Sequence, residues 1–290
     1  MSILLFPGQG SQYEGMGKDL YETMPTSRTW FDQADELLGF SLSKIMFEGS
    51  CEELLQTSVT QPAVFLNSII RYYLNKDSIS MDAVAGHSLG ELTALVANNT
   101  LSFENGLKLV SLRASAMQQA CNDTAGTMAA ILGLDDVIIE NLCRTVEGVV
   151  VAANYNCPGQ LVISGEIPAV EKAVVLAKEQ GAKRALVLPV NGAFHSPLMS
   201  SAKEKLAEAI SEIKFENPTK PIYQNVSSIP ELNPNVIQSN LIEQMTNPVK
   251  WTQSMQNMKS DGYSEYTEFG AKVLSGFVRR LDRTLVVNQF

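Results

Sequence analysis

The sequence contains few of the residues that metal sites and disulfide frameworks need. Its 290 residues include four cysteines and two histidines. No two cysteines form a Cys-x-x-Cys pair, and no group of cysteines and histidines has the spacing of a zinc site. We therefore predict that Cys51, Cys121, Cys143 and Cys157 are reduced thiols in a cytoplasmic protein that holds no metal.

Long apolar runs and an excess of positive charge are also missing. No stretch is long enough to span a membrane, and Met1–Pro7 lacks the basic start of a signal peptide, so we expect a first strand there. The net charge of −9 does not favour nucleic acid or an anionic membrane as a partner. An anionic substrate would have to be held by a few placed Arg or Lys side chains.

One reactive motif is present. Gly86-His87-Ser88-Leu89-Gly90 follows a short apolar run, Met81–Ala85, and precedes a helical pattern. A strand that turns sharply into a helix exposes the serine hydroxyl, and its flanking positions need glycine because a β-carbon would collide with neighbouring backbone. The motif predicts that Ser88 is a nucleophile. The alternative interpretation is a plain turn of small residues.

Two common phosphate-binding motifs are absent. Gly8-Gln9-Gly10 begins like Gly-x-Gly-x-x-Gly, but Tyr13 occupies the position of the third glycine. No segment ends in the Gly-Lys-Ser/Thr of a phosphate loop. We instead interpret Pro7–Gln12 as a tight turn after the first strand, which brings a second backbone N–H donor close to Ser88.

The pattern of elements predicts an α/β protein with a parallel sheet and an inserted small domain. Before residue 124, strands at Ile3–Phe6 and Ala83–Ala85 alternate with helices at Thr29–Leu38, Pro62–Leu74 and Phe103–Ala120. The next segments are predicted as strand, helix, two strands, helix and strand: Thr127–Leu132, Asp135–Val146, Val149–Ala153, Gln160–Ser164, Ile167–Gln180 and Lys183–Val190. A turn at Asn154–Gly159 would join the two middle strands. This order is that of a ferredoxin-like (βαββαβ) unit.

The predicted boundaries are therefore 125–192 for the small domain and 1–124 with 193–290 for the large one. After the insertion we expect a helix at Pro197–Ile213, then loops rich in Pro and Asn, and a closing helix at Ala271–Leu281.

The search for a base that activates Ser88 is short because there are two histidines. His195 lies on a predicted loop just after the inserted unit, where the cleft between two domains should be. His87 adjoins Ser88, but its side chain should point away from the hydroxyl. His195 is the favoured base, and His87 stays as the alternative.

Several motifs in order amount to a family resemblance. They are Phe6–Gln12, Gly86–Glu91, Arg113, Asn154–Asn156, Pro158–Gln160, Gly192–Ser196 and Asn247–Trp251. Together they make the chain similar to the malonyl-CoA:acyl-carrier-protein transacylases, the acyltransferases of fatty-acid and polyketide synthesis. The resemblance covers nearly the whole chain. It implies an α/β-hydrolase-like large domain with a ferredoxin-like insert.

The resemblance also implies roles for individual residues. Ser88 would be the nucleophile, His195 its base, and the backbone carbonyl of Gln244 the group that orients His195. The backbone N–H groups of Gln9 and Leu89 would form the oxyanion hole. The substrate-binding residues would be Arg113, which grips the malonyl carboxylate, Phe194, which crowds a substituted carbon, and Asn156. By itself, Arg113 on an amphipathic helix would be a solvated surface residue.

The implied reaction is malonyl transfer from malonyl-CoA, through malonyl-Ser88, to the phosphopantetheine thiol of an acyl carrier protein. The CoA thioester would be a substrate, and no bound cofactor is needed. The pathway is predicted to be fatty-acid synthesis, with a stand-alone acyltransferase of a polyketide synthase as the alternative. A serine esterase or thioesterase and an inactive binding module are the other hypotheses. The carrier protein could dock on either of two basic groups: Lys272, Arg279, Arg280 and Arg283, or Lys183 and Arg184.

Overall fold

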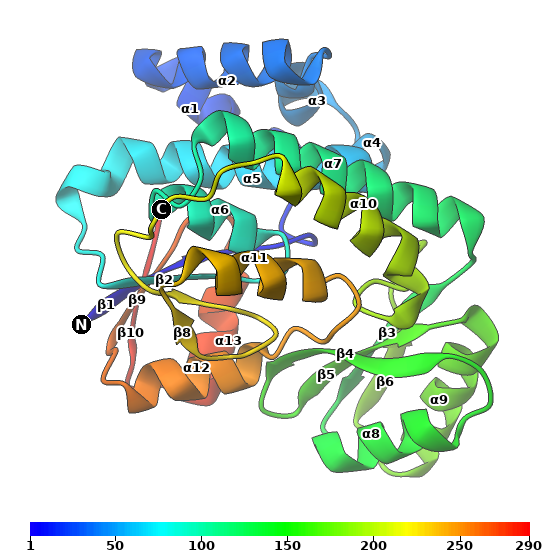
Figure 1. Cartoon of the computed structure of the whole chain (residues 1–290). Helices are drawn as coiled ribbons and strands as arrows, with labels where there is room; N and C mark the ends of the chain where they lie inside the picture. Colours follow the sequence, from blue (N-terminus) through cyan, green and yellow to red (C-terminus); the bar gives the residue numbers. More distant parts are fainter.

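The computed structural model describes all 290 residues, Met1–Phe290, and contains two β-sheets (Figure 1). The six-stranded sheet has the spatial order β10 (Val286–Gln289), β9 (Glu265–Glu268), β1 (Ser2–Phe6), β2 (Ala83–Gly86), β7 (Ile222–Tyr223) and β8 (Pro230–Glu231). Its strand pairs are parallel, except that β8 runs antiparallel to β7. The four-stranded sheet has the order β4 (Val150–Cys157), β5 (Gln160–Gly165), β3 (Thr127–Leu132) and β6 (Arg184–Val187), and all its pairs are antiparallel.

Thirteen α-helices and two short 3₁₀ helices surround these sheets. The α-helices are α1 (Lys18–Thr23), α2 (Pro25–Leu38), α3 (Leu42–Glu48), α4 (Cys51–Leu55), α5 (Thr57–Asn75), α6 (Gly90–Ala97), α7 (Phe103–Asp123), α8 (Asp136–Thr145), α9 (Ile167–Glu179), α10 (Ser200–Ser211), α11 (Pro234–Glu243), α12 (Trp251–Ser260) and α13 (Leu274–Leu281). The 3₁₀ helices are η1 (Lys76–Ser78) and η2 (Pro197–Met199). None of the helices combines the length and the apolar character that a membrane crossing needs.

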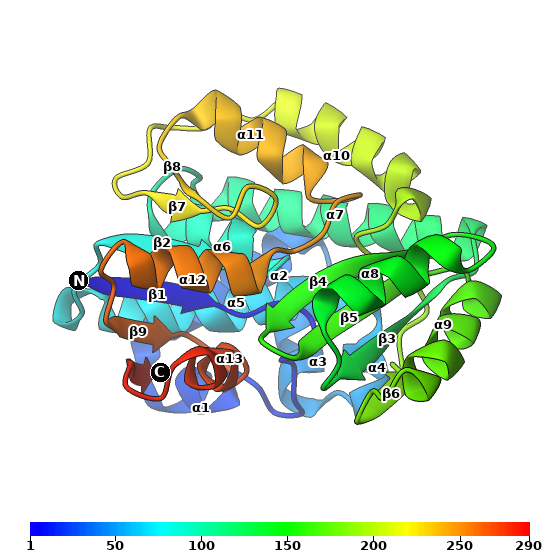
Figure 2. The ribbon, with the colours of Figure 1, turned by 90° about the horizontal axis from the view of Figure 1, so that it is seen from below.

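Helices cover both faces of the six-stranded sheet, so its central strands are apolar at nearly every position. Leu4 and Phe6 of β1 pack on one face in a core shared with α5, α6 and α7, above the sheet in Figure 1. Ile3 and Leu5 pack on the opposite face with Trp251 of α12 and with α13, which lie over the near face of the sheet in Figure 2. Alternate residues of a strand point to opposite faces, so burial on both sides explains the uninterrupted apolar run.

The four-stranded sheet has a core of its own. Ala129 and Ile131 of β3 pack against Ile139 of α8 and Val170 of α9, which cover one face of this sheet (Figure 1). Met128, on the other face of β3, belongs to the core of the larger sheet and lines the cavity beside Ser88. The site therefore lies where one face of the small sheet meets the helices of the large one.

The predicted turn at Asn154–Gly159 is wrong, because β4 continues to Cys157. The residues between β4 and β5 are Pro158 and Gly159, and Gly159 has a φ of 73°. Two shifts of register along β4 keep it paired with β5 where polar residues interrupt the apolar pattern.

The predicted loops between 214 and 270 are also wrong in part. This region contains α11 and α12 and the short strands β7, β8 and β9. Asn233 caps α11 by accepting a hydrogen bond from the N–H of Asn235, and Pro234 fills the first helical position. Asn and Pro therefore start a helix here instead of marking a loop. The helix expected over Pro197–Ile213 is η2 followed by α10.

Candidate active site

The Gly-x-Ser-x-Gly motif forms the turn between β2 and α6. Ser88 has a φ of 53°, in the left-handed region that residues other than glycine rarely adopt. A β-carbon at Gly86 would lie 1.9 Å from the backbone of Gly90, and one at Gly90 would lie 2.0 Å from the carbonyl oxygen of Phe6. Both positions therefore require glycine, for the steric reason that the motif suggested.

The turn after β1 lies against this serine turn, because Phe6 pairs with Gly86 at the ends of two parallel strands. Gln9, in that turn, lines the same cavity as Ser88. The backbone N–H groups of Gln9 and Leu89 donate no hydrogen bond within the chain. The N–H of Ser88 is occupied, because it donates to Asn225 Oδ1 at 2.6 Å. Gln9 and Leu89 are thus the available donors for a developing oxyanion.

His195 contacts the serine hydroxyl. Its Nε2 lies 2.8 Å from Ser88 Oγ, and its Nδ1 lies 2.8 Å from the backbone oxygen of Gln244. A carbonyl oxygen only accepts, so Nδ1 carries the proton and Nε2 accepts from the Ser88 hydroxyl. Burial, helped by the positive charge of Arg113, lowers the pKa of His195 to about 3. The imidazole is therefore neutral at neutral pH and can receive a proton.

His87, the alternative base, makes no hydrogen bond with Ser88. Its Nε2 lies 2.9 Å from Asn156 Oδ1, and its ring packs edge-on against Trp251. Burial lowers the pKa of His87 to about 4. Asn156 lines the cavity and also fixes this neutral imidazole.

Arg113 reaches the serine from α7 and is only 1% exposed, unlike the surface residue that its helix position alone suggests. Its Nη2 donates to Ser88 Oγ and to Gln244 Oε1, both at 3.0 Å, and its Nη1 donates to Gln61 Oε1 at 2.7 Å. Burial lowers the pKa of Arg113 to about 10, so the guanidinium stays charged at neutral pH, and Glu91 partly opposes the shift.

This buried charge has no carboxylate partner. Arg113 belongs to none of the ion pairs of the structure, and its Nε has no hydrogen-bond partner. Burying an unpaired cation is costly, and a guanidinium binds carboxylates in a forked, two-bond geometry. Arg113 is therefore positioned to receive an anionic group beside Ser88.

Ser88, His195 and Arg113 line a cavity of about 590 Å³. Its walls come from the small sheet, from α5 and α7 and from the turns after β1 and β2, and they include Phe194, which is buried next to His195. This volume lies in the range of small-molecule sites. No three His, Cys, Asp or Glu side chains lie close enough together to hold a metal ion.

Sequence reasoning missed four contributors to this site: Gln61, Glu91, Asn225 and the side chain of Gln244. Glu91 directly follows the Gly-x-Ser-x-Gly motif, so its position could have drawn attention to it. Gln61 and Asn225 lie on segments with no motif, and only the fold brings them to Ser88.

The residues predicted for carrier docking lie in two separate places. Arg279, Arg280 and Arg283 are exposed on and after α13, and Arg280 Nη1 donates to Gln160 of the small sheet at 2.9 Å. Lys183 and Arg184 are exposed at the start of β6, whereas the cavity is lined by Leu188, just beyond its other end.

Residues 3–271 match the family model described as acyl transferase domain, and the chain belongs to this acyltransferase family. The malonyl CoA-acyl carrier protein transacylase of Bacillus subtilis strain 168 is 45% identical over 286 residues, which cover 97% of this chain and 90% of that protein. An acyl carrier protein S-malonyltransferase from Vibrio cholerae has a solved structure that is 40% identical, with a TM-score of 0.95 and coverage of 100% and 96%. A malonyl-transacylase solved in complex with its type II PKS acyl-carrier protein is 37% identical, with a TM-score of 0.96 and coverage of 100% and 95%. The predicted family resemblance is confirmed.

Proposed function

We propose that this chain transfers a malonyl group from malonyl-CoA to the phosphopantetheine thiol of an acyl carrier protein. The transfer passes through a malonyl ester of Ser88. The observation that carries the proposal is the buried, unpaired guanidinium of Arg113, 3.0 Å from the serine hydroxyl. An acyl group with a free carboxylate would place that carboxylate on Arg113 while its thioester carbon faces Ser88.

In the first half-reaction His195 Nε2 takes the proton of the Ser88 hydroxyl while Oγ attacks the thioester carbonyl. The carbonyl oxygen becomes an oxyanion that accepts hydrogen bonds from the N–H groups of Gln9 and Leu89. The intermediate then expels the CoA sulfur, which leaves as a thiol with the proton held by His195. Gln244 supports the imidazolium through its carbonyl dipole, where a Ser-His-Asp site uses a carboxylate.

In the second half-reaction the phosphopantetheine thiol gives its proton to His195 and attacks the malonyl ester. The ester bond to Ser88 Oγ breaks, Oγ recovers the proton, and malonyl leaves on the carrier thioester. Each half exchanges one ester or thioester for another, so no metal, oxidant or bound cofactor is required. We assign Phe194 to exclude a substituent on the malonyl carbon, and Asn156 to line the acyl or pantetheine path beside His87.

We also propose the finer architecture that the resemblance implies. The α/β-hydrolase-like large domain would comprise 1–124 and 193–290, and the ferredoxin-like small domain 125–192. The strand order β4-β5-β3-β6, with α8 and α9 on one face, supports the second assignment. Four free cysteines fit a reducing compartment, and we propose the cytoplasm.

The pathway assignment is fatty-acid synthesis, and service to a polyketide synthase is the alternative that the type II PKS carrier complex of one relative supports. Both pathways need the same site chemistry, so the physiological carrier decides between them. For docking we propose the group Lys272, Arg279, Arg280 and Arg283 first, because Arg280 touches the small sheet, and Lys183 with Arg184 second.

The test is transfer of labelled malonyl from malonyl-CoA to a phosphopantetheinylated carrier protein, using the wild type and His195→Ala. We expect carrier labelling by the wild type and a loss of about 10²–10⁴-fold in the variant, the usual contribution of a general base. Rapid release of free malonate without carrier protein would instead identify a thioesterase. A chain that neither transfers nor hydrolyses malonyl would be a binding module.

A further inference from the structure

Asn225 meets the nucleophile turn but has no part in the steps above. It lies two residues beyond β7 and is completely buried. Its Oδ1 accepts the N–H of Ser88 at 2.6 Å, and its Nδ2 donates to the carbonyl oxygen of Gly86 at 2.7 Å. The side-chain carboxamide of Asn225 therefore bonds to the residues immediately before and after His87.

This carboxamide continues the hydrogen bonding of the parallel sheet. Strands β2 and β7 pair up to Ala85 and Tyr223, and the backbone ladder ends there. In a parallel ladder, one residue bonds through its N–H and C=O to the two residues that flank its partner. The Asn225 side chain reproduces this pattern, because it bonds to Gly86 and Ser88, which flank His87.

We propose that Asn225 is a positioning residue that holds Ser88 in its left-handed conformation and so aligns Oγ with His195. A non-glycine residue with a φ of 53° is strained, and it needs surrounding contacts to persist. The two hydrogen bonds of Asn225 supply such contacts at the strained residue itself. They also occupy the Ser88 N–H, which leaves the oxyanion to Gln9 and Leu89.

Other buried groups fix the orientation of Asn225. Glu91 accepts the backbone N–H of Asn225 at 2.7 Å and the Nε2 of Gln224 at 3.1 Å. Gln244 Nε2 donates to Asn225 Oδ1 at 3.3 Å and to the Ser88 carbonyl at 3.1 Å. Because the Ser88 N–H and Gln244 Nε2 both donate to Oδ1, the Nδ2 side of the carboxamide faces Gly86. Only a carboxamide of this length can accept and donate at the two places, since Asp cannot donate and Ala does neither.

Asn98 offers a matched control. It is also completely buried, and its carboxamide also joins two segments by donating to the Lys220 carbonyl at 3.1 Å and accepting from the Thr100 hydroxyl at 2.7 Å. It follows the C-terminal end of α6 and does not line the cavity. Replacement of either residue removes a similar set of buried hydrogen bonds, but only Asn225 contacts Ser88.

The experiment compares Asn225→Ala with Asn98→Ala by single-turnover loading of malonyl from malonyl-CoA. Both variants should unfold at a lower temperature than the wild type. At a temperature where all are folded, we expect Asn98→Ala to load within about twofold of the wild-type rate. Asn225→Ala should load about 10²-fold more slowly at saturation, the cost of a small misplacement of a reacting group. The malonyl-CoA concentration for half-maximal rate should stay within about threefold, because Asn225 does not line the cavity.

A second variant covers the case in which Asn225→Ala does not fold. Asn225→Asp keeps the volume and the acceptor but loses the donor to Gly86, so we expect slower loading and faster hydrogen exchange in a peptide that covers residues 86–90. Loading by either Asn225 variant within threefold of Asn98→Ala would overturn the proposal, as would unchanged exchange in Asn225→Asp. The kinetic readout rests on the proposed function. If that function fails, the wild type itself will not load malonyl. Hydrogen exchange in residues 86–90 will still test whether Asn225 holds the turn that carries Ser88.

Discussion

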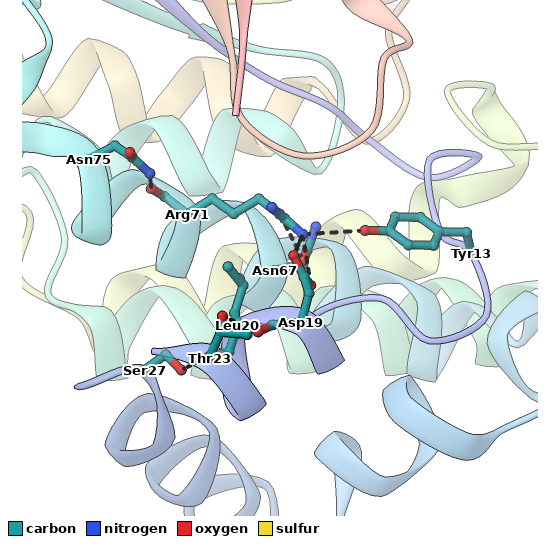
Figure 3. A network of polar contacts seen from close by, with 8 residues as sticks. All are labelled: Tyr13, Asp19, Leu20, Thr23, Ser27, Asn67, Arg71 and Asn75. Atoms are coloured by element: carbon teal, nitrogen blue, oxygen red, sulfur yellow. Dashed lines mark hydrogen bonds and ion pairs between the residues drawn. The ribbon is translucent and has the colours of Figure 1, made fainter. Parts of the chain in front are cut away.

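Two arginines line two cavities of this chain, and they differ in what neutralises them. Arg71 lines a cavity of about 720 Å³, and its Nη2 lies 3.1 Å from both carboxylate oxygens of Asp19, with Asn67 and Tyr13 as further partners (Figure 3). Arg113 lines the cavity of about 590 Å³ and hydrogen-bonds only to the neutral oxygens of Ser88, Gln61 and Gln244. The reactive serine therefore lies in the cavity whose arginine has no carboxylate partner.

The two arginines differ in how the surrounding protein compensates their positive charge. Asp19 compensates Arg71 within the chain, so that cavity has no electrostatic need for a ligand. Arg113 is more deeply buried, and its charge is met by dipoles and by the more distant Glu91. Removing one member of a buried ion pair destabilises a protein because the other charge stays uncompensated. A malonyl carboxylate would complete such a pair at Arg113 each time the enzyme is loaded.

The largest expected effect follows from removing the unpaired cation. Arg113→Ala should lower kcat/KM for malonyl-CoA about 10²–10³-fold, because a buried charge-assisted pair is worth a few kcal/mol. Loading from acetyl-CoA, which has no carboxylate, should change much less. Arg71→Ala is the matched control, and it should leave kcat/KM unchanged for both malonyl-CoA and acetyl-CoA. Steady-state kinetics with the two donors would refute the distinction if Arg113→Ala slowed them equally.

A smaller effect is expected when Arg113 is made to resemble Arg71. Gln61→Glu places a carboxylate where the Gln61 oxygen lies, 2.7 Å from Arg113 Nη1. This internal carboxylate should compete with malonyl and raise its KM about 10–10²-fold, while acetyl loading persists. Gln61→Met, which removes the polar group without adding charge, separates this competition from a simple loss of the hydrogen bond. A malonyl KM in Gln61→Glu equal to that of Gln61→Met would contradict the interpretation.

The effect of pH on the rate of malonyl loading should be smaller than the effects of these substitutions. The pKa of His195 is lowered to about 3, so the imidazole stays unprotonated, and free to accept the Ser88 proton, as the pH falls toward that value. Malonyl loading should change by less than about twofold between pH 8 and pH 6, whereas a histidine of ordinary pKa near 6.5 would lose about fourfold. Because the charge of Arg113 helps to lower this pKa, acetyl loading by Arg113→Ala should begin to fall at a higher pH than in the wild type. Rapid-mixing rates across this range provide the measurement.

The smallest effect belongs to the paired arginine. Asp19 is largely exposed, with 59% of its side chain accessible, so its ion pair with Arg71 is partly screened. Asp19→Asn should lower the free energy of unfolding by about 1 kcal/mol or less, as measured with urea, and leave malonyl transfer unchanged. A loss of transfer in Asp19→Asn would show that the second cavity takes part in the reaction.

Motifs set by local sterics could be predicted from the sequence. The need for Gly86 follows from a collision with the nearby backbone of Gly90, and the strand β3 was predicted with the bounds that the structure has. The need for Gly90 follows from Phe6 on the neighbouring strand, and the known steric pattern of the motif anticipates it. The contact between Ser88 and His195 required a further argument, that histidine is scarce and a serine needs a base.

Features set by long-range packing could not be predicted. The burial of Arg113 depends on segments that carry Gln61 and Gln244, far from α7 in the sequence. The helices α11 and α12 lie in a stretch whose Pro and Asn residues suggested loops, because a helix cap and a turn use the same residue types. Asn225 has no motif at all, and only the end of the β7 ladder reveals its position.

The most direct test of the central claim is intact-protein mass after brief mixing with equal amounts of malonyl-CoA and acetyl-CoA. The account predicts that the wild type and Arg71→Ala carry mainly one malonyl group, that Arg113→Ala loses this preference, and that Ser88→Ala carries neither acyl group. An unchanged malonyl preference in Arg113→Ala, or a malonyl adduct on Ser88→Ala, would contradict the assignment of a carboxylate-binding arginine beside a serine nucleophile.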